Sequence, residues 1–152
     1  MATQFDFTND DWDHVATTPV LVGMAVAKAE DSGFLGSIRE TRALLATMAE
    51  GSEDNPARTL IDQAAATETS VDLDDLKRRS ADALATDAEA ACARLAELLP
   101  EVAEPDVGDG YKRWILELAA AVAEAAKEDG QLISPGEVEV IGRVSAALGY
   151  DR

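Results

Sequence analysis

The stretch that decides the fold is Lys127–Glu137, with the sequence KEDGQLISPGE. Gly130 follows an alanine-rich helical pattern, at the place where a helix end needs a left-handed residue and glycine supplies it without strain. Ser134 fits the N-cap of a second helix, Pro135 its first position, and Glu137 completes a capping box. The stretch therefore predicts a helix–turn–helix hairpin with an acidic turn, which we call the acidic elbow.

Helical patterns extend outward from the elbow over most of the chain. Cap residues and apolar spacing predict helices that begin near Thr8, Thr18, Ser37, Asn55, Val71, Tyr111 and Ser134. Thr18 counts as a new start because a proline follows it, and a further break is predicted near Asp87. The longest loop is expected over 100–110, which is rich in acid, proline and glycine. No strand pattern competes with these helices.

The fold class predicted for residues 1–152 is therefore a single all-α domain, a compact bundle of six to eight helices. Its expected core contains large apolar side chains at helical spacing: Trp12, Trp114, Ile115, Leu118, Val122 and Ile141. The apolar positions of the last helix are Val138, Ile141, Val144 and Leu148. Tyr111 and Trp114 lie one helical turn apart. They could line a ligand groove, but aromatic residues at this spacing usually belong to a core.

The net charge of −17 results from 30 acidic and 13 basic residues spread along the chain. Nucleic-acid binding needs a basic stripe, and the short run Lys77–Arg79 does not supply one, so nucleic acids and anionic membrane surfaces are excluded as partners. No apolar run reaches the length of a membrane span and the N-terminus does not resemble a signal peptide, so we expect a cytoplasmic protein. The acidity fits a halophilic source or a high-GC composition, and the sequence leaves both open.

The sequence carries no motif for an enzyme. Cys92 is the one cysteine, in an apolar helical pattern, and His14 is the one histidine, in a distant segment. A di-iron bundle needs Glu-x-x-His motifs, which are absent, as are phosphate loops and nucleophile elbows. The prediction is a non-enzymatic protein with Cys92 buried as a small apolar residue.

The acidic elbow has a counterpart earlier in the chain. Residues 33–40 (GFLGSIRE) align without a gap on residues 130–137 (GQLISPGE), with Gly, Leu, Ser and Glu at matching positions. A duplication would give two helical hairpins related by pseudo-twofold symmetry. The alternative is that short helical hairpins share these turn and cap residues for local reasons.

The elbow and its flanking helices resemble the TerB-like group, which includes the tellurite-resistance protein TerB. The matching residues are Asp129, Gly130, Ser134, Glu137 and Ile141. The resemblance is strongest over residues 114–148 and loose over residues 20–48.

This resemblance implies a compact helical domain with internal pseudo-symmetry, a link to metal stress, and divalent-cation binding through acidic residues. The first elbow departs from the pattern, because Ser32 stands where the second has Asp129. Residues 52–100 have no match in the group.

A metal site at the elbow would use carboxylate oxygens, the ligands that Ca²⁺ and Mg²⁺ prefer. The candidate ligands come from both elbows: Glu128, Asp129, Glu137, Glu30, Asp31 and Glu40. The spacing is not that of an EF-hand. In the other interpretation, Glu137 closes its capping box and the remaining acids are solvated.

Two functions follow from these observations. One is a TerB-like domain that senses or buffers a divalent cation during stress. The other is a structural or interaction module that binds a protein partner without any metal.

The first prediction concerns salt. Like charges repel in a folded protein of net charge −17, and molar salt screens that repulsion. We expect the melting temperature to rise from dilute buffer to concentrated KCl. A level or falling melting temperature would show that charge repulsion does not limit stability.

Overall fold

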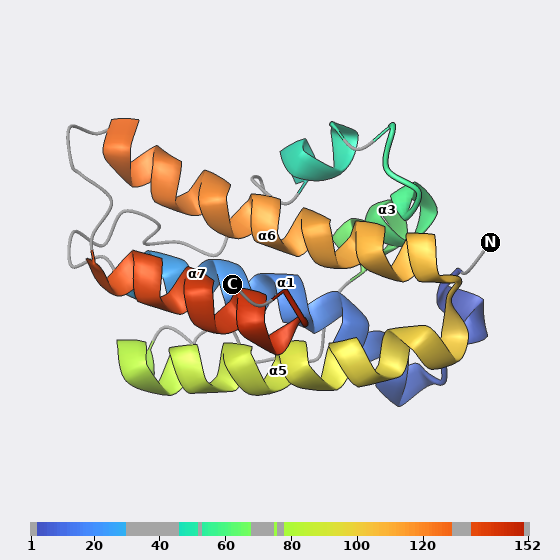
Figure 1. Ribbon diagram of the computed structural model, residues 1–152, viewed down its shortest axis with the longest axis horizontal. Helices are drawn as coiled ribbons and strands as arrows, with labels where there is room; N and C mark the ends of the chain where they lie inside the picture. The colour runs from blue at the N-terminus through green and yellow to red at the C-terminus, as the bar shows by residue number, and fades with distance from the viewer. Residues whose placement is uncertain are drawn as a thin grey trace.

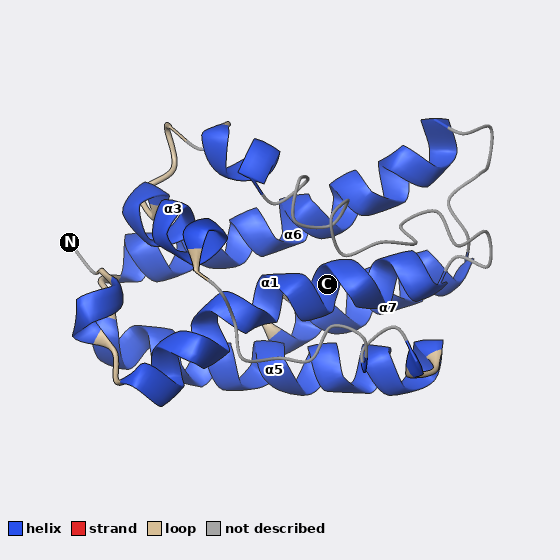
Figure 2. Ribbon diagram, turned by 180° about the vertical axis from the view of Figure 1, so that it is seen from behind, coloured by secondary structure: helices blue, strands red, loops and turns tan. Residues whose placement is uncertain are grey.

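The computed structural model describes residues 3–29, 46–51, 53–67, 75, 78–128 and 135–150. Of residues 4, 29, 125–128, 135 and 137 only the backbone is described. The elements in this part of the chain are all helices, which confirms the predicted all-α class (Figures 1 and 2). They are η1 (Gln4–Asp6), α1 (Asn9–Ala29), α3 (Arg58–Ala66), α5 (Ala81–Val102), α6 (Pro105–Glu128) and α7 (Pro135–Ala147), and residues 46–50 are also helical.

Four long helices form the bundle, and α3 packs beside α6 and α1 (Figure 1). The helices α1 and α6 run in one direction, while α5 and α7 run in the other. At one end of the bundle α1 and α6 finish and α5 and α7 begin, and we call this the elbow end. At the other end α1 begins and α5 turns into α6, and we call this the corner end.

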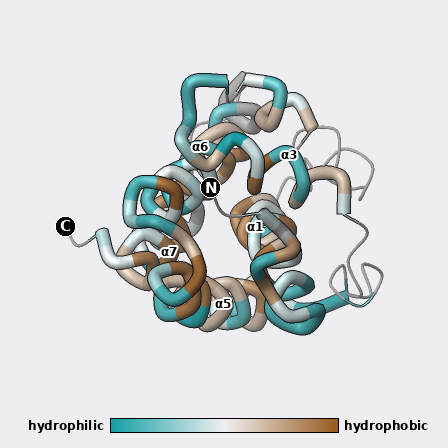
Figure 3. Tube along the Cα trace, turned by 90° about the vertical axis from the view of Figure 1, so that its right-hand side faces the viewer, coloured by the Kyte–Doolittle hydropathy of each residue, from teal (hydrophilic) through white to brown (hydrophobic). Residues whose placement is uncertain are grey.

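The core lies between these helices, whose hydrophobic positions face one another in the end view (Figure 3). Five predicted core residues are buried: Trp12, Trp114, Ile115, Leu118 and Val122. Ile141 is only partly buried against the core. Of the apolar positions predicted along the last helix, Val144 and Leu148 are buried, but Val138 is 59% exposed, so the prediction for Val138 is wrong. Val140 is buried in its place, because the i, i+4, i+8 spacing of Val140, Val144 and Leu148 puts three apolar residues along one side of α7.

The prediction of a new helix at Thr18 is wrong, because α1 continues through Pro19. Proline has no backbone N–H, so it cannot donate to the carbonyl of Val15, four residues earlier. The buried hydroxyl of Tyr111 in α6 donates to that carbonyl at 2.9 Å. The Thr18 hydroxyl is also buried, and it donates to the carbonyl of His14 at 2.8 Å. These bonds let the helix accommodate a proline that the local sequence assigns to a helix start.

The predicted loop over 100–110 is also wrong. Helix α5 includes Pro100 in its last turn, and α6 begins at Pro105, so only Ala103 and Glu104 separate the two helices. Pro100 is exposed and lies near the end of α5, where a missing N–H interrupts little of the helix. Pro105 occupies the first helical position, where proline needs no N–H partner.

The two glycines of that stretch lie inside α6 because neighbouring segments approach it closely. A Cβ on Gly110 would stand 2.3 Å from Oδ1 of Asn55. The Asn55 amide donates to the Gly110 carbonyl at 3.0 Å, while its Oδ1 accepts from the N–H of Ala57 at 2.7 Å. Asn55 therefore attaches the start of α3 to the first turns of α6, and only a residue without a side chain fits at Gly110.

The predicted helix start at Val71 lies outside the described residues. Residues 75 and 78 are helical, but residues 79 and 80 are not, so α5 begins as a separate helix at Ala81. Ser80 has extended backbone and caps it by accepting from the N–H of Ala83 at 3.1 Å. The break expected near Asp87 does not occur, and the carboxylate of Asp87 forms an ion pair with Arg79 instead. At the start of α1, by contrast, the predicted cap is confirmed, since Thr8 accepts from the N–H of Asp11 at 3.1 Å.

The bond between Tyr111 and Val15 yields the second prediction. In Tyr111→Phe the carbonyl of Val15 is buried without a donor, so the free energy of unfolding should fall by about 1–3 kcal/mol. Urea denaturation followed by circular dichroism measures this change.

The matched comparison uses Pro19→Ala, which returns a backbone N–H to the helix at the position that faces Val15. In the Pro19→Ala background, Tyr111→Phe should lower the free energy of unfolding by less, because the carbonyl of Val15 keeps a donor. Equal costs in the two backgrounds would show that the hydroxyl does not act as a substitute for the missing N–H.

Candidate functional site

The predicted metal ligands lie around the elbow end, mostly outside the described residues. Glu128 is the last residue of α6 and Glu137 lies in the first turn of α7, with only their backbones described. Asp129 follows Glu128 directly and falls outside the described part of the chain. The three candidates from the first elbow, Glu30, Asp31 and Glu40, also fall outside it.

The topology nevertheless brings the described helix ends next to these residues together. Helix α1 stops at Ala29, immediately before Glu30, and α6 stops at Glu128 at the same end of the bundle (Figure 1). Helix α7 begins there at Pro135 and packs against both α1 and α6. Segments far apart in the sequence thus enter and leave the bundle at one place.

The described charges at the elbow end have both signs. Asp82 in the first turn of α5, Glu124 near the end of α6 and Glu139 in α7 are exposed acids, while Lys28 in the last turn of α1 and Arg79 just before α5 are exposed bases. Arg79 pairs with Asp75 and Asp87, and Arg143 of α7 reaches across to α5 and pairs with Glu89 at 2.9 Å.

The described side chains do not themselves form a metal site. Within that part of the chain, no group of three or more His, Cys, Asp or Glu is arranged to hold a metal ion.

His14 and Cys92 lie at the interface between α1 and α5. The Nε2–H of His14 donates to the carbonyl of Ala91, the residue before Cys92, at 3.0 Å. Cys92 is fully buried, and this desolvation raises the pKa of its thiol to about 12. The thiol is therefore protonated at neutral pH, while His14 holds the two helices together.

A further cluster, which the sequence did not indicate, fastens the end of α7 to α6. Gly149 has a φ of 100° and directs the chain back, so that the N–H of Tyr150 donates to the carbonyl of Ser145 at 2.9 Å. The Tyr150 hydroxyl donates to the carboxylate of Asp109, which also accepts from Arg113 at 3.0 Å. Burial and the bond to Asp109 raise the pKa of Tyr150 to about 12.

Lys112 completes this cluster, with its Nζ 5.5 Å from the centroid of the Tyr150 ring. Gly149 is the one residue of this cluster with a sequence signal, because glycine commonly follows a helix end. Gly149 indicates where the chain turns after α7, but the contact of Tyr150 with Asp109 of α6 depends on how the two helices pack.

The described surface has hollows of different character. One, of about 350 Å³, lies between residues 47–56 and α6 and is lined by charged and polar side chains, including Asp54, Arg113 and Glu117. The other, of about 300 Å³, lies where α5 turns into α6, and we call it the corner hollow. Its apolar lining comes from Leu99, Pro100, Ala103, Pro105 and Gly108.

No model of a known family, no curated protein and no solved structure matches this chain. Over the described residues, no helix is long and apolar enough to span a membrane.

The third prediction follows from the position of His14. Burial lowers its pKa below 6.5, and Arg94 lowers it further, against the bond to Ala91 and the charges of Asp11 and Asp13, which raise it. As the pH falls, His14 is therefore protonated at a higher pH in the unfolded chain than in the folded protein. The contribution of His14 to stability is complete above pH 6.5 and is lost as the pH falls through its lowered pKa.

The test compares the wild type with His14→Gln, whose amide keeps a donor for the carbonyl of Ala91. Chemical denaturation between pH 7.5 and 5.5 should show the wild type losing stability relative to the variant. A relative gain on acidification would mean that Asp11 and Asp13 outweigh burial.

Proposed function

We propose that this chain is a non-enzymatic, TerB-like helical domain that binds a divalent cation, Ca²⁺ or Mg²⁺, at the elbow end of its bundle. The observation that supports this most is the topology. It brings the end of α1, the end of α6 and the start of α7 to one end, and each is adjacent to or contains predicted ligands (Figure 1).

Carboxylates from separate segments suit such a cation. Calcium takes six to eight oxygen ligands, and magnesium needs fewer protein ligands because it keeps several waters. Glu128 and Glu137 flank the connection between α6 and α7, and Glu30 follows α1 directly. A bound cation would also relieve repulsion among these acids in a chain of net charge −17.

The role in the cell would be to sense or buffer the cation during stress, which is what the resemblance to the TerB-like group implies. A cation that binds only the folded state stabilises it, and the stabilisation grows with the logarithm of the cation concentration once this exceeds the dissociation constant. Binding across the elbow would therefore make the stability of the hairpin of α6 and α7 depend on the cation concentration. This link between occupancy and fold is what a sensor without catalytic groups requires.

The fourth prediction tests this proposal with Asp129→Asn, which keeps the size of the side chain and removes its charge. Calorimetric titration with Ca²⁺ and Mg²⁺ should show weaker binding than in the wild type. The metal-free variant should unfold at the same temperature or slightly higher, because crowded carboxylates repel one another.

Two further variants separate a ligand from a general charge effect. Glu137→Gln can still close a capping box, so a large loss of cation binding would indicate that Glu137 is a ligand. Glu139→Gln is the matched control, because it removes one exposed charge from α7 two residues further on. It should weaken binding only as much as the loss of one nearby charge does.

Absence of binding to the wild type would overturn the proposal. The chain would then be an interaction module, the alternative that the sequence left open. Equal losses in Asp129→Asn and Glu139→Gln would reduce the site to diffuse attraction of cations by an acidic surface.

A further inference from the structure

The longest run of adjacent basic residues in the sequence directly precedes a serine. Lys77–Arg79 are followed by Ser80, in a chain whose 13 basic residues are outnumbered by 30 acids. The other adjacent basic pair, Lys112–Arg113, precedes a tryptophan. Ser80 is therefore the one serine or threonine of the chain that follows two or more consecutive basic residues. The proposed cation site makes no use of this run.

Ser80 lies at a break between helical segments, where it is exposed. Residue 78 is helical, residues 79 and 80 are not, and α5 begins at Ala81. The backbone of Ser80 is extended, with a φ of −68° and a ψ of 160°. Its hydroxyl oxygen accepts from the N–H of Ala83 at 3.1 Å. A hydroxyl on an exposed, extended residue is accessible to an enzyme that modifies it, once the first turn of α5 frays.

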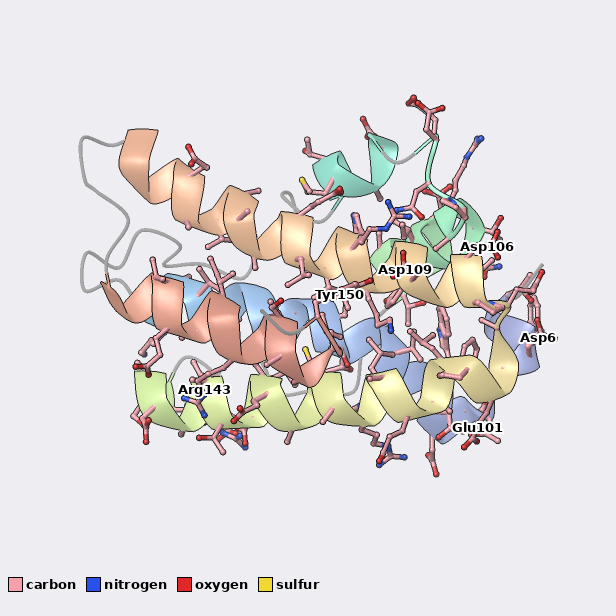
Figure 4. The ribbon with its side chains drawn as sticks, in the orientation of Figure 1. Asp6, Glu101, Asp106, Asp109, Arg143 and Tyr150 are labelled. Carbon is pink, nitrogen blue, oxygen red and sulfur yellow. The ribbon has the colours of Figure 1, made fainter. Side chains whose placement is uncertain are left out.

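The arginines before Ser80 are available to another protein. Arg78 is exposed and forms no ion pair or hydrogen bond within the described part of the chain. Arg79 pairs with Asp75 at 3.0 Å and with Asp87, but all three side chains are more than a third exposed. Exposed pairs of this kind are weak, so Arg79 can exchange its partners for those of a binding protein. Arg143 also reaches toward α5, from α7 (Figure 4), and it is already bound to a glutamate there.

We propose that Ser80 is a phosphorylation site for a serine kinase that recognises basic residues before the serine. Kinases select substrates partly by charge pattern, and acids in the substrate groove of such a kinase would bind Lys77–Arg79. The Ser80 hydroxyl oxygen forms a bond to the γ-phosphorus of ATP as the bond from that phosphorus to its bridging oxygen breaks. ADP leaves, and the hydroxyl proton passes to the catalytic aspartate of the kinase.

The modified serine would remain the cap of α5. Phosphoserine has a charge of about −1.5 to −2 at pH 7 and three acceptor oxygens. It would lie at the positive end of a helix of 22 residues, whose first N–H groups have no partner within the helix. Arg78 and Arg79 oppose its charge, whereas Asp82 in the first turn adds to it. The phosphate should therefore accept from the Ala83 N–H more strongly than the hydroxyl does.

The experiment treats the folded full chain with ATP, Mg²⁺ and a purified serine kinase that requires arginine before its acceptor serine. Mass spectrometry of proteolytic fragments should place the phosphoryl group on Ser80. Ser80→Asn is the matched variant, because asparagine keeps a side-chain oxygen for the Ala83 N–H but has no hydroxyl. The fragment that contains residue 80 should stay unmodified in this variant.

The double variant R78Q/R79Q tests recognition of the basic run. Because two exposed ion pairs with the kinase are lost, the initial rate at low protein concentration should fall roughly 2- to 30-fold. The variant also breaks the pairs of Arg79 with Asp75 and Asp87, which would loosen the segment and raise the rate. A fall in rate therefore identifies recognition of the arginines by the kinase.

The control is K112Q/R113Q, which removes the same charge from the other adjacent basic pair, in α6. It should leave the rate at Ser80 unchanged, because these residues do not precede the serine. Equal reductions in the two double variants would mean that general charge attracts the kinase, and this would overturn recognition of the run.

Amide spectra of the ¹⁵N-labelled protein test the effect on the cap. The amide proton of Ala83 should move downfield on phosphorylation and return after treatment with a phosphatase, because a hydrogen bond to a phosphate is stronger than one to a hydroxyl. An upfield movement would show that the phosphate leaves the cap.

The proposal would be overturned if phosphate appeared only on other residues. It would also be overturned if a synthetic peptide of residues 75–85 were modified while the folded chain was not, since the start of α5 would then exclude the kinase. Neither result bears on the proposed cation site, because no variant used here changes a residue of the acidic elbow.

Discussion

The bundle depends on the hydrogen bond from the Tyr111 hydroxyl to the carbonyl of Val15. That carbonyl is left without a helical donor by Pro19, and a buried carbonyl without a partner is costly. The bond joins α6 to α1 and sets the position of one helix along the axis of the other. Trp114, Leu118 and Val122 then follow Tyr111 into the core, and α6 reaches the end of the bundle where α1 stops.

The sequence predicted most of the helical segments, residues 100–110 excepted, but it could not predict which prolines begin helices. Thr18 and Pro19 have the same local pattern as Ser134 and Pro135, yet only the second pair has a proline that begins a helix. The difference comes from Tyr111, 96 residues from Val15, because it supplies the donor that Pro19 lacks. No local pattern contains that information, whereas single caps such as Thr8 depend on neighbours and were predicted correctly.

The candidate sites also divide into those that local sequence indicates and those that depend on the packing of the bundle. The helix end before the acidic elbow and the helix start after it could be predicted from turn and cap residues, because those act within a few positions of one another. Gly130 and Ser134 themselves lie outside the described residues. The convergence of α1 with the elbow required the packing of the whole bundle. The corner hollow was missed because Pro100 and Gly110 were interpreted as loop residues. Pro105 carried the usual signal for the first position of a helix, and that signal could have moved the expected start of α6 forward.

The placement of charge connects the fold to the proposed cation site. Several arginines form ion pairs along the sides of the bundle: Arg143 joins α7 to Glu89 of α5, and Arg94 of α5 lies 3.5 Å from Asp11 of α1. Exposed pairs of this kind add little stability each, but they neutralise acids where helices meet. At the elbow end, Arg79 pairs with Asp87 in the same way. A cation bound at this end would neutralise further acids there, as the arginines do where helices meet.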